Sequence, residues 1–413
     1  MLSPYRVLDL STERGLLCGQ ILGDLDADVL KIEPPSGSPA RRCGPFFQDQ
    51  PHPNHSLYWW AYNRNKRSIT LNIDTSEGQA ILRRLVESAH FFIESDTPGS
   101  LAKCGLSYDT LAALNPALVY VSITPFGQDG PKASYADSDL IILAAGGPLV
   151  LSGDDDRPPV RMGVPQGYLH ASAQAAAAAL IAHHERQHSG RGQHVDVSAQ
   201  QAVAQATQSA ILAAPLGEAE IQRMAGGVKI GPLAVRLIWP AKDGYVSIAY
   251  LFGSAIGPFT RRLMQWIYEE GFCDEATRDK DWIAFGSLFF GDPEAIAEYE
   301  RLKQVVEDFT ASKTKAELLQ GALERVLLIA PITTVEEVVH SEQLAARGYW
   351  CPVEHPELGQ SFRYPGPFAK FSVTPITYRR RPPTVGEHNH EIYVGELGFT
   401  VQQLAALQSK GVI

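Results

Sequence analysis

The sequence predicts an α/β fold with a parallel sheet covered by helices, and two observations support this. The first is a strand–helix–strand unit with short connections at residues 5–34. The second is a series of later short apolar segments that alternate with helical patterns. Parallel strands buried on both faces read as apolar runs, and the helices between them cover the sheet.

The N-terminal unit begins with an apolar strand candidate, YRVLDL, at 5–10. Residues 14–25 follow as an amphipathic helix, and DVLKIEP at 28–34 is the second strand candidate. This strand stops at Pro34 and Pro35, because proline has no backbone N–H to donate to a sheet. The arrangement is typical of parallel strands joined by a crossover helix.

Three more strands are expected further along the chain. In RSITLNI at 67–73, polar residues alternate with apolar ones. Thr75 is then a plausible N-cap for a helix that runs to about His90. The apolar segments 90–95 and 118–123 are the other two strand candidates.

The next segment predicts a long alanine-rich helix at 169–187, with Gly190 as its C-cap. A strand at 194–198 and a second helix at 199–214 follow. The last element is a helix at 401–409.

The length of the chain and a change in its sequence pattern favour two domains. Its 413 residues exceed the usual size of one domain. The sequence around 215–235 reads as a linker or loop. Residues 236–335 then have their own pattern, a β-like stretch followed by helices rich in Glu and Lys. We expect this middle part to form a smaller domain.

Composition excludes several classes of function. The formal net charge of -10 argues against non-specific binding to nucleic acid. The five cysteines are scattered and form no CxxC pair, so neither a disulfide framework nor a structural zinc site is expected. The sequence has no apolar run long enough to span a membrane and no signal-peptide pattern. We therefore expect a soluble, cytoplasmic protein.

Six segments resemble, in order, the signatures of the class III coenzyme A (CoA) transferases of the CaiB/BaiF type. Together they extend over nearly the whole chain. They lie at 19–42, 63–73, 95–131, 184–203, 328–350 and 385–399. The resemblance implies a doubly wound, Rossmann-like large domain built from both chain ends, 1–220 and 335–413. It also implies a smaller α+β domain at 221–334 and a dimer of two interlocked rings.

What this family implies for chemistry is a CoA thioester as substrate, with no metal and no permanently bound cofactor. An aspartate attacks the thioester, forms a mixed anhydride and then becomes an aspartyl-CoA thioester. The resemblance places that aspartate just before the long helix, where this chain reads Gly163-Val-Pro-Gln-Gly-Tyr168. A phenol has a pKa of about 10 and cannot become the acyl part of a thioester. We therefore expect no catalytic nucleophile in this chain, with Tyr168 at the nucleophile position.

Other residues are poor substitutes for the missing carboxylate. The acidic turn at 154–156 is expected to be a solvated loop. Asp196 lies in a strand, and Asp139 matches a family position that orients backbone. The racemases of the family use a histidine and an aspartate. These would fall near Ser138 and in the turn of Tyr168, and both are absent here.

CoA carries a diphosphate and a 3′-phosphate, so cations near loops are candidates for binding it. The candidates are Arg41, Arg42, Arg64, Lys66, Arg67 and Lys132. Each could equally be an ordinary surface cation. Three histidines, His183, His184 and His188, have helical spacing that a metal could use. We expect no metal site, because no matching ligand pattern accompanies them.

Three functions stay open at this point. The first is the non-catalytic subunit of a heteromeric CoA-transferase of the succinyl-CoA:benzylsuccinate type, with a paralogous partner that carries the aspartate. Enzymes of that type act in the degradation of aromatic compounds. The second is a stand-alone acyl-CoA isomerase, racemase or lyase, with Tyr168 as acid and His170 as base. The third is a CoA-binding or scaffold protein without catalysis.

Overall fold

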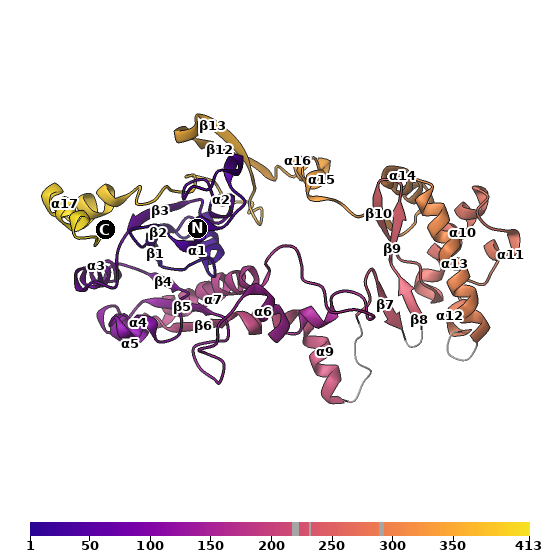
Figure 1. Cartoon of the computed structure of the whole chain (residues 1–413), viewed down its shortest axis with the longest axis horizontal. Helices are drawn as coiled ribbons and strands as arrows, with labels where there is room; N and C mark the ends of the chain where they lie inside the picture. Colours follow the sequence, from indigo (N-terminus) through magenta and orange to yellow (C-terminus); the bar gives the residue numbers. More distant parts are fainter. Residues whose placement is uncertain (217–222, 231–232, 289–292) are drawn as a thin grey trace. The chain divides into compact units, whose positions relative to one another are not determined.

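The computed structural model describes residues 1–216, 223–230, 233–288 and 293–413. The chain divides into two compact units (Figure 1). The large unit comprises Met1–Pro148, Met162–Gln208 and Glu342–Ile413, and the small unit comprises Leu149–Arg161 and Ser209–Ser341.

These limits differ in detail from the predicted domains. The predicted boundary between 220 and 221 lies outside the described residues, and the units divide at 208/209 instead. The second division lies at 341/342, where 334/335 was predicted. Residues 149–161 group with the small unit. Both chain ends contribute to the large unit.

The large unit contains a six-stranded sheet in which every neighbouring pair is parallel. Its strand order is β3-β2-β1-β4-β5-β6. The direction in which strands are added reverses between β1 and β4, as in doubly wound nucleotide-binding folds. The predicted α/β class is confirmed. The strands are β1 (Arg6–Asp9), β2 (Asp28–Glu33), β3 (Lys66–Thr70), β4 (Phe91–Glu94), β5 (Val119–Thr124) and β6 (His194–Ser198).

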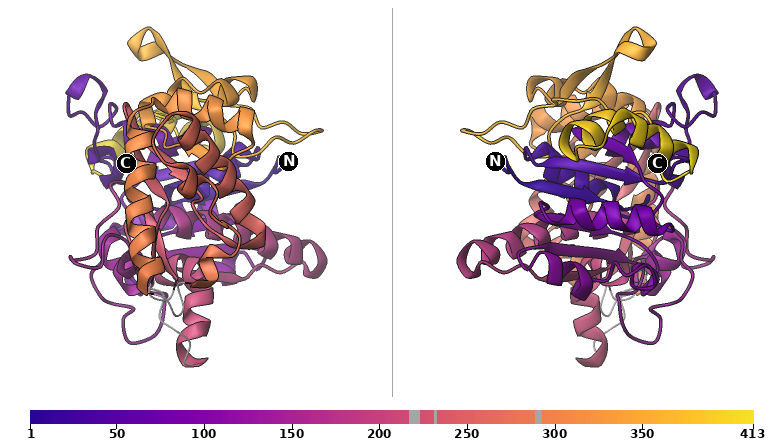
Figure 2. Two further views of the ribbon diagram at one scale, coloured as in Figure 1. Left: turned by 90° about the vertical axis from the view of Figure 1, so that its right-hand side faces the viewer. Right: turned by 90° about the vertical axis from the view of Figure 1, so that its left-hand side faces the viewer.

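Helices cover this sheet and fill the connections between its strands (Figure 2). The large-unit helices are α1 (Leu16–Asp24), α2 (Leu57–Tyr62), α3 (Ser76–Val86), α4 (Ser100–Lys103), α5 (Tyr108–Leu114), α6 (Asp139–Ala145), α7 (Gly167–Ser189), α8 (Ala199–Ala204), α16 (Glu342–Ala346) and α17 (Val401–Ser409). A separate hairpin joins β12 (Trp350–His355) to β13 (Gln360–Pro365).

Two neighbouring residues of β4 show that both faces of the sheet are covered. Phe92 lies in a core cluster with Leu82 of α3 and Leu404 of α17. Successive side chains of a strand point to opposite faces. Phe91 accordingly lies on the other side, with the guanidinium of Arg186 from α7 5.1 Å from its ring centroid. This double burial explains why the strand sequence is apolar without alternation.

The C-terminal segment is tied to the N-terminal strands by polar contacts. The Tyr393 hydroxyl donates to the carbonyl oxygen of Thr70 at 2.6 Å. The backbone N–H of Asn72 donates to the carbonyl oxygen of Val412 at 2.7 Å. The large unit is therefore built from both chain ends, as the family resemblance implies.

Two helix ends lie where the capping residues in the sequence predict them. The Thr75 hydroxyl accepts a hydrogen bond from the Gly78 N–H at 3.0 Å and caps α3. Gly190 ends α7 in the left-handed conformation, with φ of 70°. The predicted helix at 199–214 is instead divided into α8, a 3₁₀ turn and α9 (Gln208–Ala213). The Thr207 hydroxyl bonds the Ala204 carbonyl at 3.0 Å, and such a side-chain bond competes with regular helix geometry.

The small unit has its own antiparallel sheet, ordered β11-β10-β9. Its core includes the buried Trp239, Tyr250 and Trp282. Its elements are β7 (Gly227–Ile230), β8 (Leu233–Arg236), β9 (Ile238–Ala241), β10 (Gly244–Ile248), α10 (Gly253–Glu269), α11 (Glu275–Arg278), α12 (Phe285–Leu288), α13 (Pro293–Ala311), α14 (Lys315–Arg325), β11 (Ile329–Pro331) and α15 (Val335–Val339). Across the described residues, no helix combines the length and apolarity that a membrane span requires.

Candidate functional site

The first turn of α7 is fixed by a carboxylate from another helix. Asp139, at the start of α6, accepts hydrogen bonds through one oxygen, Oδ1. The donors are the backbone N–H groups of Gln166 and Gly167, at 2.6 and 2.7 Å. The first amides of a helix carry a partial positive charge and lack partners within the helix, so a carboxylate there is stabilising. The expectation that Asp139 orients backbone is confirmed.

Tyr168 follows directly in this turn, and its hydroxyl donates to Oδ2 of Asp137. The other oxygen of that carboxylate, Oδ1, accepts from Nη2 of Arg14 at 2.6 Å. The guanidinium carbon of Arg14 also lies 5.8 Å from the centroid of the Tyr168 ring. The Asp137 side chain is 8% exposed. The position that the family resemblance predicts for the nucleophile thus holds a phenol bonded to a buried carboxylate.

This environment makes Tyr168 a weak acid. Burial raises the pKa of the phenol well above its ordinary value, and the hydrogen bond to Asp137 raises it further. Arg14 opposes both effects without reversing them. The hydroxyl therefore stays protonated at neutral pH, and it acts as a hydrogen-bond donor rather than as a nucleophile.

The alternative acid–base pair is not brought together in this arrangement. The hydroxyl of Tyr168 is engaged with Asp137, whereas the side chain of His170 is exposed. Residues two apart on a helix do not share a face. The structure thus pairs Tyr168 with a carboxylate from a loop, not with the neighbouring histidine.

The acidic turn predicted to be solvated lies in the small unit. Asp154 pairs with Arg157, and Asp155 pairs with Lys229. Asp156 is 79% exposed.

Asp196, in β6 of the large unit, accepts a hydrogen bond from the backbone N–H of Gln128 at 2.9 Å. This contact fixes the connection that follows β5. The predicted structural role of Asp196 agrees with it.

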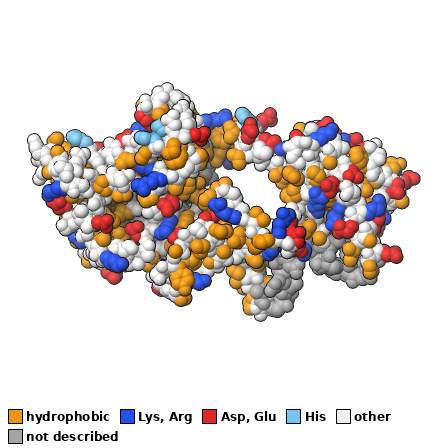
Figure 3. Space-filling model, viewed as in Figure 1, with side chains coloured by type: hydrophobic (Ala, Val, Ile, Leu, Met, Phe, Trp, Pro, Cys, Tyr) orange, Lys and Arg blue, Asp and Glu red, His pale blue; other side chains and the backbone are white. Residues whose placement is uncertain are grey.

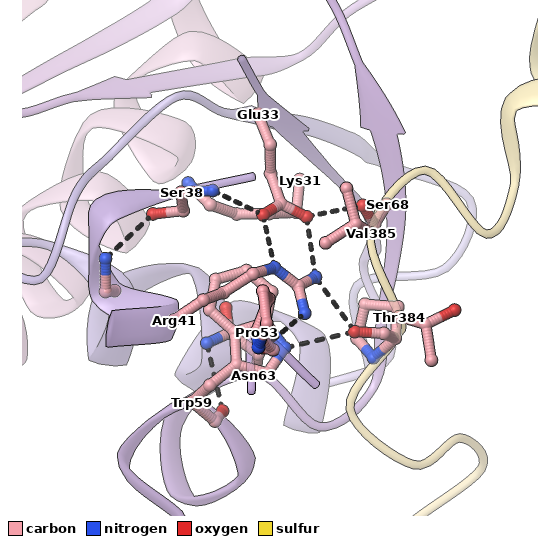
Figure 4. A network of polar contacts seen from close by, with 12 residues as sticks. Lys31, Glu33, Ser38, Arg41, Pro53, Trp59, Asn63, Ser68, Thr384 and Val385 are labelled. Atoms are coloured by element: carbon pink, nitrogen blue, oxygen red, sulfur yellow. Dashed lines mark hydrogen bonds and ion pairs between the residues drawn. The ribbon is translucent and has the colours of Figure 1, made fainter. Parts of the chain in front are cut away.

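Arg41, a predicted CoA ligand, lies inside the large unit (Figure 4). Its guanidinium forms two hydrogen bonds with the Glu33 carboxylate, Nε at 2.6 Å and Nη2 at 2.8 Å. Nη2 also donates to the carbonyl oxygen of Pro383 at 3.0 Å. The guanidinium lies 3.7 Å from the ring centroid of Trp59. The two charged side chains are 1% and 0% exposed.

Lys66 is also buried, in a cluster around Asp9. Its ammonium donates to Asp9 Oδ2 at 2.9 Å and to the Leu16 carbonyl at 2.8 Å. Lys31 bonds the other oxygen of Asp9 at 3.2 Å. Burial alone would raise the pKa of Asp9, but the two ammonium groups outweigh it and hold the value at about 2. The charged groups of this cluster are therefore buried among the strands of the large unit.

Two more predicted ligands are neutralised within the fold. Arg64 bonds Asp24 at 2.9 Å, and Arg67 pairs with Asp28 at 2.6 Å. Arg67 further contacts Glu391 and Glu396 of the C-terminal segment, at 2.7 Å each.

Lys132, by contrast, is exposed on the connection after β5. The surface in Figure 3 likewise shows cationic and anionic side chains interspersed. Arg42 is exposed as well, and that any of the six cations binds CoA stays a prediction.

The three histidines near the C-terminal end of α7 do not gather around one point. His183 is buried and contacts Nη2 of Arg186 at 2.5 Å. Burial, with a further contribution from Arg186, lowers the pKa of His183 to about 4. His184 and His188 face each other, with their Nε2 atoms 3.3 Å apart. Among the residues with a described placement, no group of three metal-binding side chains is found.

A pocket of about 340 Å³ lies at the carboxyl ends of the strands. It is lined by residues that follow β1, β2, β3 and β4, next to the point where the strand order reverses. Ligands of doubly wound sheets bind in this crevice. Its lining includes Glu33, Asp74 and Asp96. Burial raises the pKa of Asp96, with Arg14 opposing.

Arg14 and Asp137 were missed as site residues by sequence reasoning. They are 123 positions apart, so no local motif joins them. Arg14 follows β1 and Asp137 follows β5. The carboxyl ends of parallel strands meet at one edge of the sheet, so the predicted topology was the signal that could have brought them together.

Comparison with known proteins gives three findings that extend over the chain. The model of CoA-transferase family III matches residues 2–389. The succinyl-CoA:(R)-benzylsuccinate CoA-transferase subunit BbsE of Thauera aromatica is 33% identical over 412 residues, covering 100% of this chain and 98% of that protein. The succinyl-CoA–D-citramalate CoA-transferase of Chloroflexus aurantiacus is 33% identical over 415 residues, with 100% and 98% covered.

A solved structure agrees with the fold. The crystal structure of a CaiB/BaiF family protein from Brucella suis has a TM-score of 0.79 and 29% sequence identity. It covers 95% of this chain, which in turn covers 98% of that one.

Proposed function

This chain belongs to CoA-transferase family III, and from that premise we propose that it is the non-catalytic subunit of a heteromeric CoA-transferase. Its partner is a paralogous subunit that carries the nucleophilic aspartate. The two assemble as interlocked rings in the cytoplasm, and CoA enters only as a substrate thioester. The complex moves CoA from an acyl-CoA to a free carboxylic acid.

The single observation that carries this proposal is Tyr168 at the nucleophile position. The reaction needs a carboxylate oxygen that attacks the thioester carbonyl and expels CoA thiolate. The thiolate must then attack the enzyme's own carbonyl carbon, which a phenol lacks. The raised pKa of Tyr168 and its hydrogen bond to Asp137 also leave the phenol protonated. Both arguments assign the covalent steps to another chain.

The relatives support the choice of partner and substrates. BbsE is named as a subunit, and its enzyme uses succinyl-CoA and (R)-benzylsuccinate. The citramalate enzyme uses succinyl-CoA as well. We propose succinyl-CoA as donor and a dicarboxylic acid, such as an aryl succinate, as acceptor.

Among the six predicted CoA ligands, Arg42 and Lys132 are exposed, and we propose Lys132 as the one that meets a phosphate. Arg41, Arg64, Lys66 and Arg67 are each bonded to carboxylates of the large unit. Leaving any of those carboxylates buried and unpaired would be costly. We propose that these four cations contribute to CoA binding only indirectly, by holding the ends of the strands in shape.

The test is to find which chain becomes acylated. The chain is co-expressed with a paralogue that carries aspartate in the matching turn. The purified complex is mixed with succinyl-CoA and trapped with hydroxylamine, and both chains are analysed by mass spectrometry. We expect the modification on the partner's aspartate, and none when that aspartate is changed to asparagine.

Modification of this chain instead would refute the proposal. CoA transfer by this chain alone, at the rate of the complex, would do so as well. Turnover of an acyl-CoA without an acceptor acid would favour the stand-alone isomerase or lyase. Failure to bind any CoA ester, with or without a partner, would favour a scaffold.

A further inference from the structure

We propose that Arg14 and Tyr168 form a binding site for the carboxylate of a free dicarboxylic acid, and that the Asp137 side chain fills this site when no acid is bound. The inference rests on the proposed function, since the ligand is a free acid of that reaction, either the acceptor or the succinate released from the donor. It assigns this subunit a ligand site of its own without assigning it covalent chemistry.

The first observation is that two donors converge on one carboxylate. Nη2 of Arg14 bonds Oδ1 of Asp137 at 2.6 Å, and the Tyr168 hydroxyl bonds Oδ2. Hydrogen bonds from a guanidinium to a carboxylate are among the strongest in proteins. A ligand carboxylate presents the same two oxygens and the same charge, so it can replace Asp137 at both donors.

The second observation is that the donors are fixed by the fold. Arg14 directs Nη1 to the carbonyl oxygen of Ser95 at 3.3 Å. Its own carbonyl oxygen accepts from the hydroxyl of Ser172, in α7, at 3.1 Å. Tyr168 lies in the first turn of the same helix, which Asp139 anchors. Preorganised donors on rigid elements are what a binding site needs.

The third observation is that the acceptor comes from a surface connection. Residues 129–132 and 134–136, which precede Asp137, are exposed. Gly127 and Gly130 have φ values of 97° and 90° there, conformations that glycine adopts without strain. Asp137 is thus a buried carboxylate at the end of an exposed segment. Its side chain alone must turn outward, because Ser138 caps α6 and Asp139 anchors the first turn of α7.

Charge explains why Asp137 must leave when an acid binds. Asp139 also lies at this end of α7, although its Oδ1 is already bonded to backbone amides. Glu13, next to Arg14 in sequence, adds to the negative field at Tyr168. A ligand carboxylate beside a resident Asp137 would meet uncompensated repulsion. Asp137 therefore acts as an internal competitor, which lowers the apparent affinity for the acid.

The test is succinate binding to the purified full-length chain, measured by isothermal titration calorimetry. Asp137→Asn removes the competing charge and keeps the side-chain shape, so we expect succinate to bind about tenfold more tightly. Arg14→Gln should abolish binding in both the wild-type and the Asp137→Asn background. Tyr168→Phe should weaken it several-fold. Succinamide, which has no charge, should not bind to any variant.

Thermal unfolding of each variant separates lost binding from lost folding. Should Asp137→Asn fail to fold, Asp137→Ser provides the same test. The site is refuted by wild-type affinity in Arg14→Gln, or by equal or weaker binding in a folded Asp137 variant. Hydroxylamine labelling of Asp137 itself would refute the proposed function, while the succinate titrations would still decide the binding site.

Discussion

The hydroxyl of Tyr168 and the carboxylate of Asp137 are joined by a hydrogen bond, although 31 positions separate them in the sequence. The tyrosine lies in the first turn of α7 and the aspartate ends the connection from β5 to α6. At the position predicted for the nucleophile, a neutral hydrogen-bond donor therefore faces a carboxylate. Because of this pairing, a change of charge at either residue should alter the stability of the first turn of α7.

Restoring a carboxylate at this position should destabilise the fold. Tyr168→Asp places a second negative charge beside Asp137, where like charges raise each other's pKa and repel. We expect Tyr168→Asp to unfold at lower urea than wild type at pH 8, and adding Asp137→Asn to recover about 1–2 kcal/mol through their interaction. A double-mutant cycle measures this, and additive effects would contradict the prediction.

Arg41 should contribute mainly to the stability of the fold rather than to ligand binding. Arg41→Ala leaves the Glu33 carboxylate buried without its cation, which costs about 3–5 kcal/mol. Urea unfolding of the purified chain gives the free energy directly. The neighbouring exposed Arg42 is the matched control, and Arg42→Ala should stay within about 0.5 kcal/mol of wild type. Wild-type stability of Arg41→Ala would instead return Arg41 to the list of available CoA ligands.

Lys132 should make a modest, direct contribution to CoA binding. An exposed ammonium paired with a phosphate is worth about 0.2–1 kcal/mol, so Lys132→Ala should weaken CoA binding by about 1.4- to 5-fold. The effect should shrink at high salt. Titration of the complex with CoA measures it, and the exposed Lys370 provides a control substitution in the same unit. Equal affinity in both variants would remove Lys132 from the site.

Glu94 should make the large unit less stable as the pH rises. Burial raises the pKa of this carboxyl to about 7 from an ordinary value of 4.5, and the hydrogen bond from the Asp96 N–H opposes it only in part. Between these values the unfolded chain loses its proton while the folded chain keeps it. The stabilisation is therefore complete below pH 4.5 and lost as pH rises through 7, by an amount on the order of 3 kcal/mol.

The check on Glu94 is a comparison with Glu94→Gln, which cannot ionise. From pH 5 to pH 8, the free energy of unfolding should fall further for wild type than for Glu94→Gln. Parallel pH profiles would show that the carboxyl titrates normally in the fold.

Local features of this protein could be predicted from its amino-acid order. Apolar runs located the strands, Thr75 and Gly190 marked helix ends, and the last helix was predicted at 401–409, where α17 lies. That Tyr168 stands at the nucleophile position stays a prediction from the family resemblance. Such features are encoded within about ten residues, through periodicity, caps and local motifs.

Only the tertiary structure decided which charges meet. Arg41 and Lys66 appear in the sequence as loop-side cations, yet both are buried against Glu33 and Asp9. Asp137 showed no local sign of a role until the fold brought it to Tyr168. An ion pair depends on which segments the fold brings together. Arg41 and Glu33 are 8 positions apart, but 57 positions separate Lys66 from Asp9 and 123 separate Arg14 from Asp137, which no local pattern can relate.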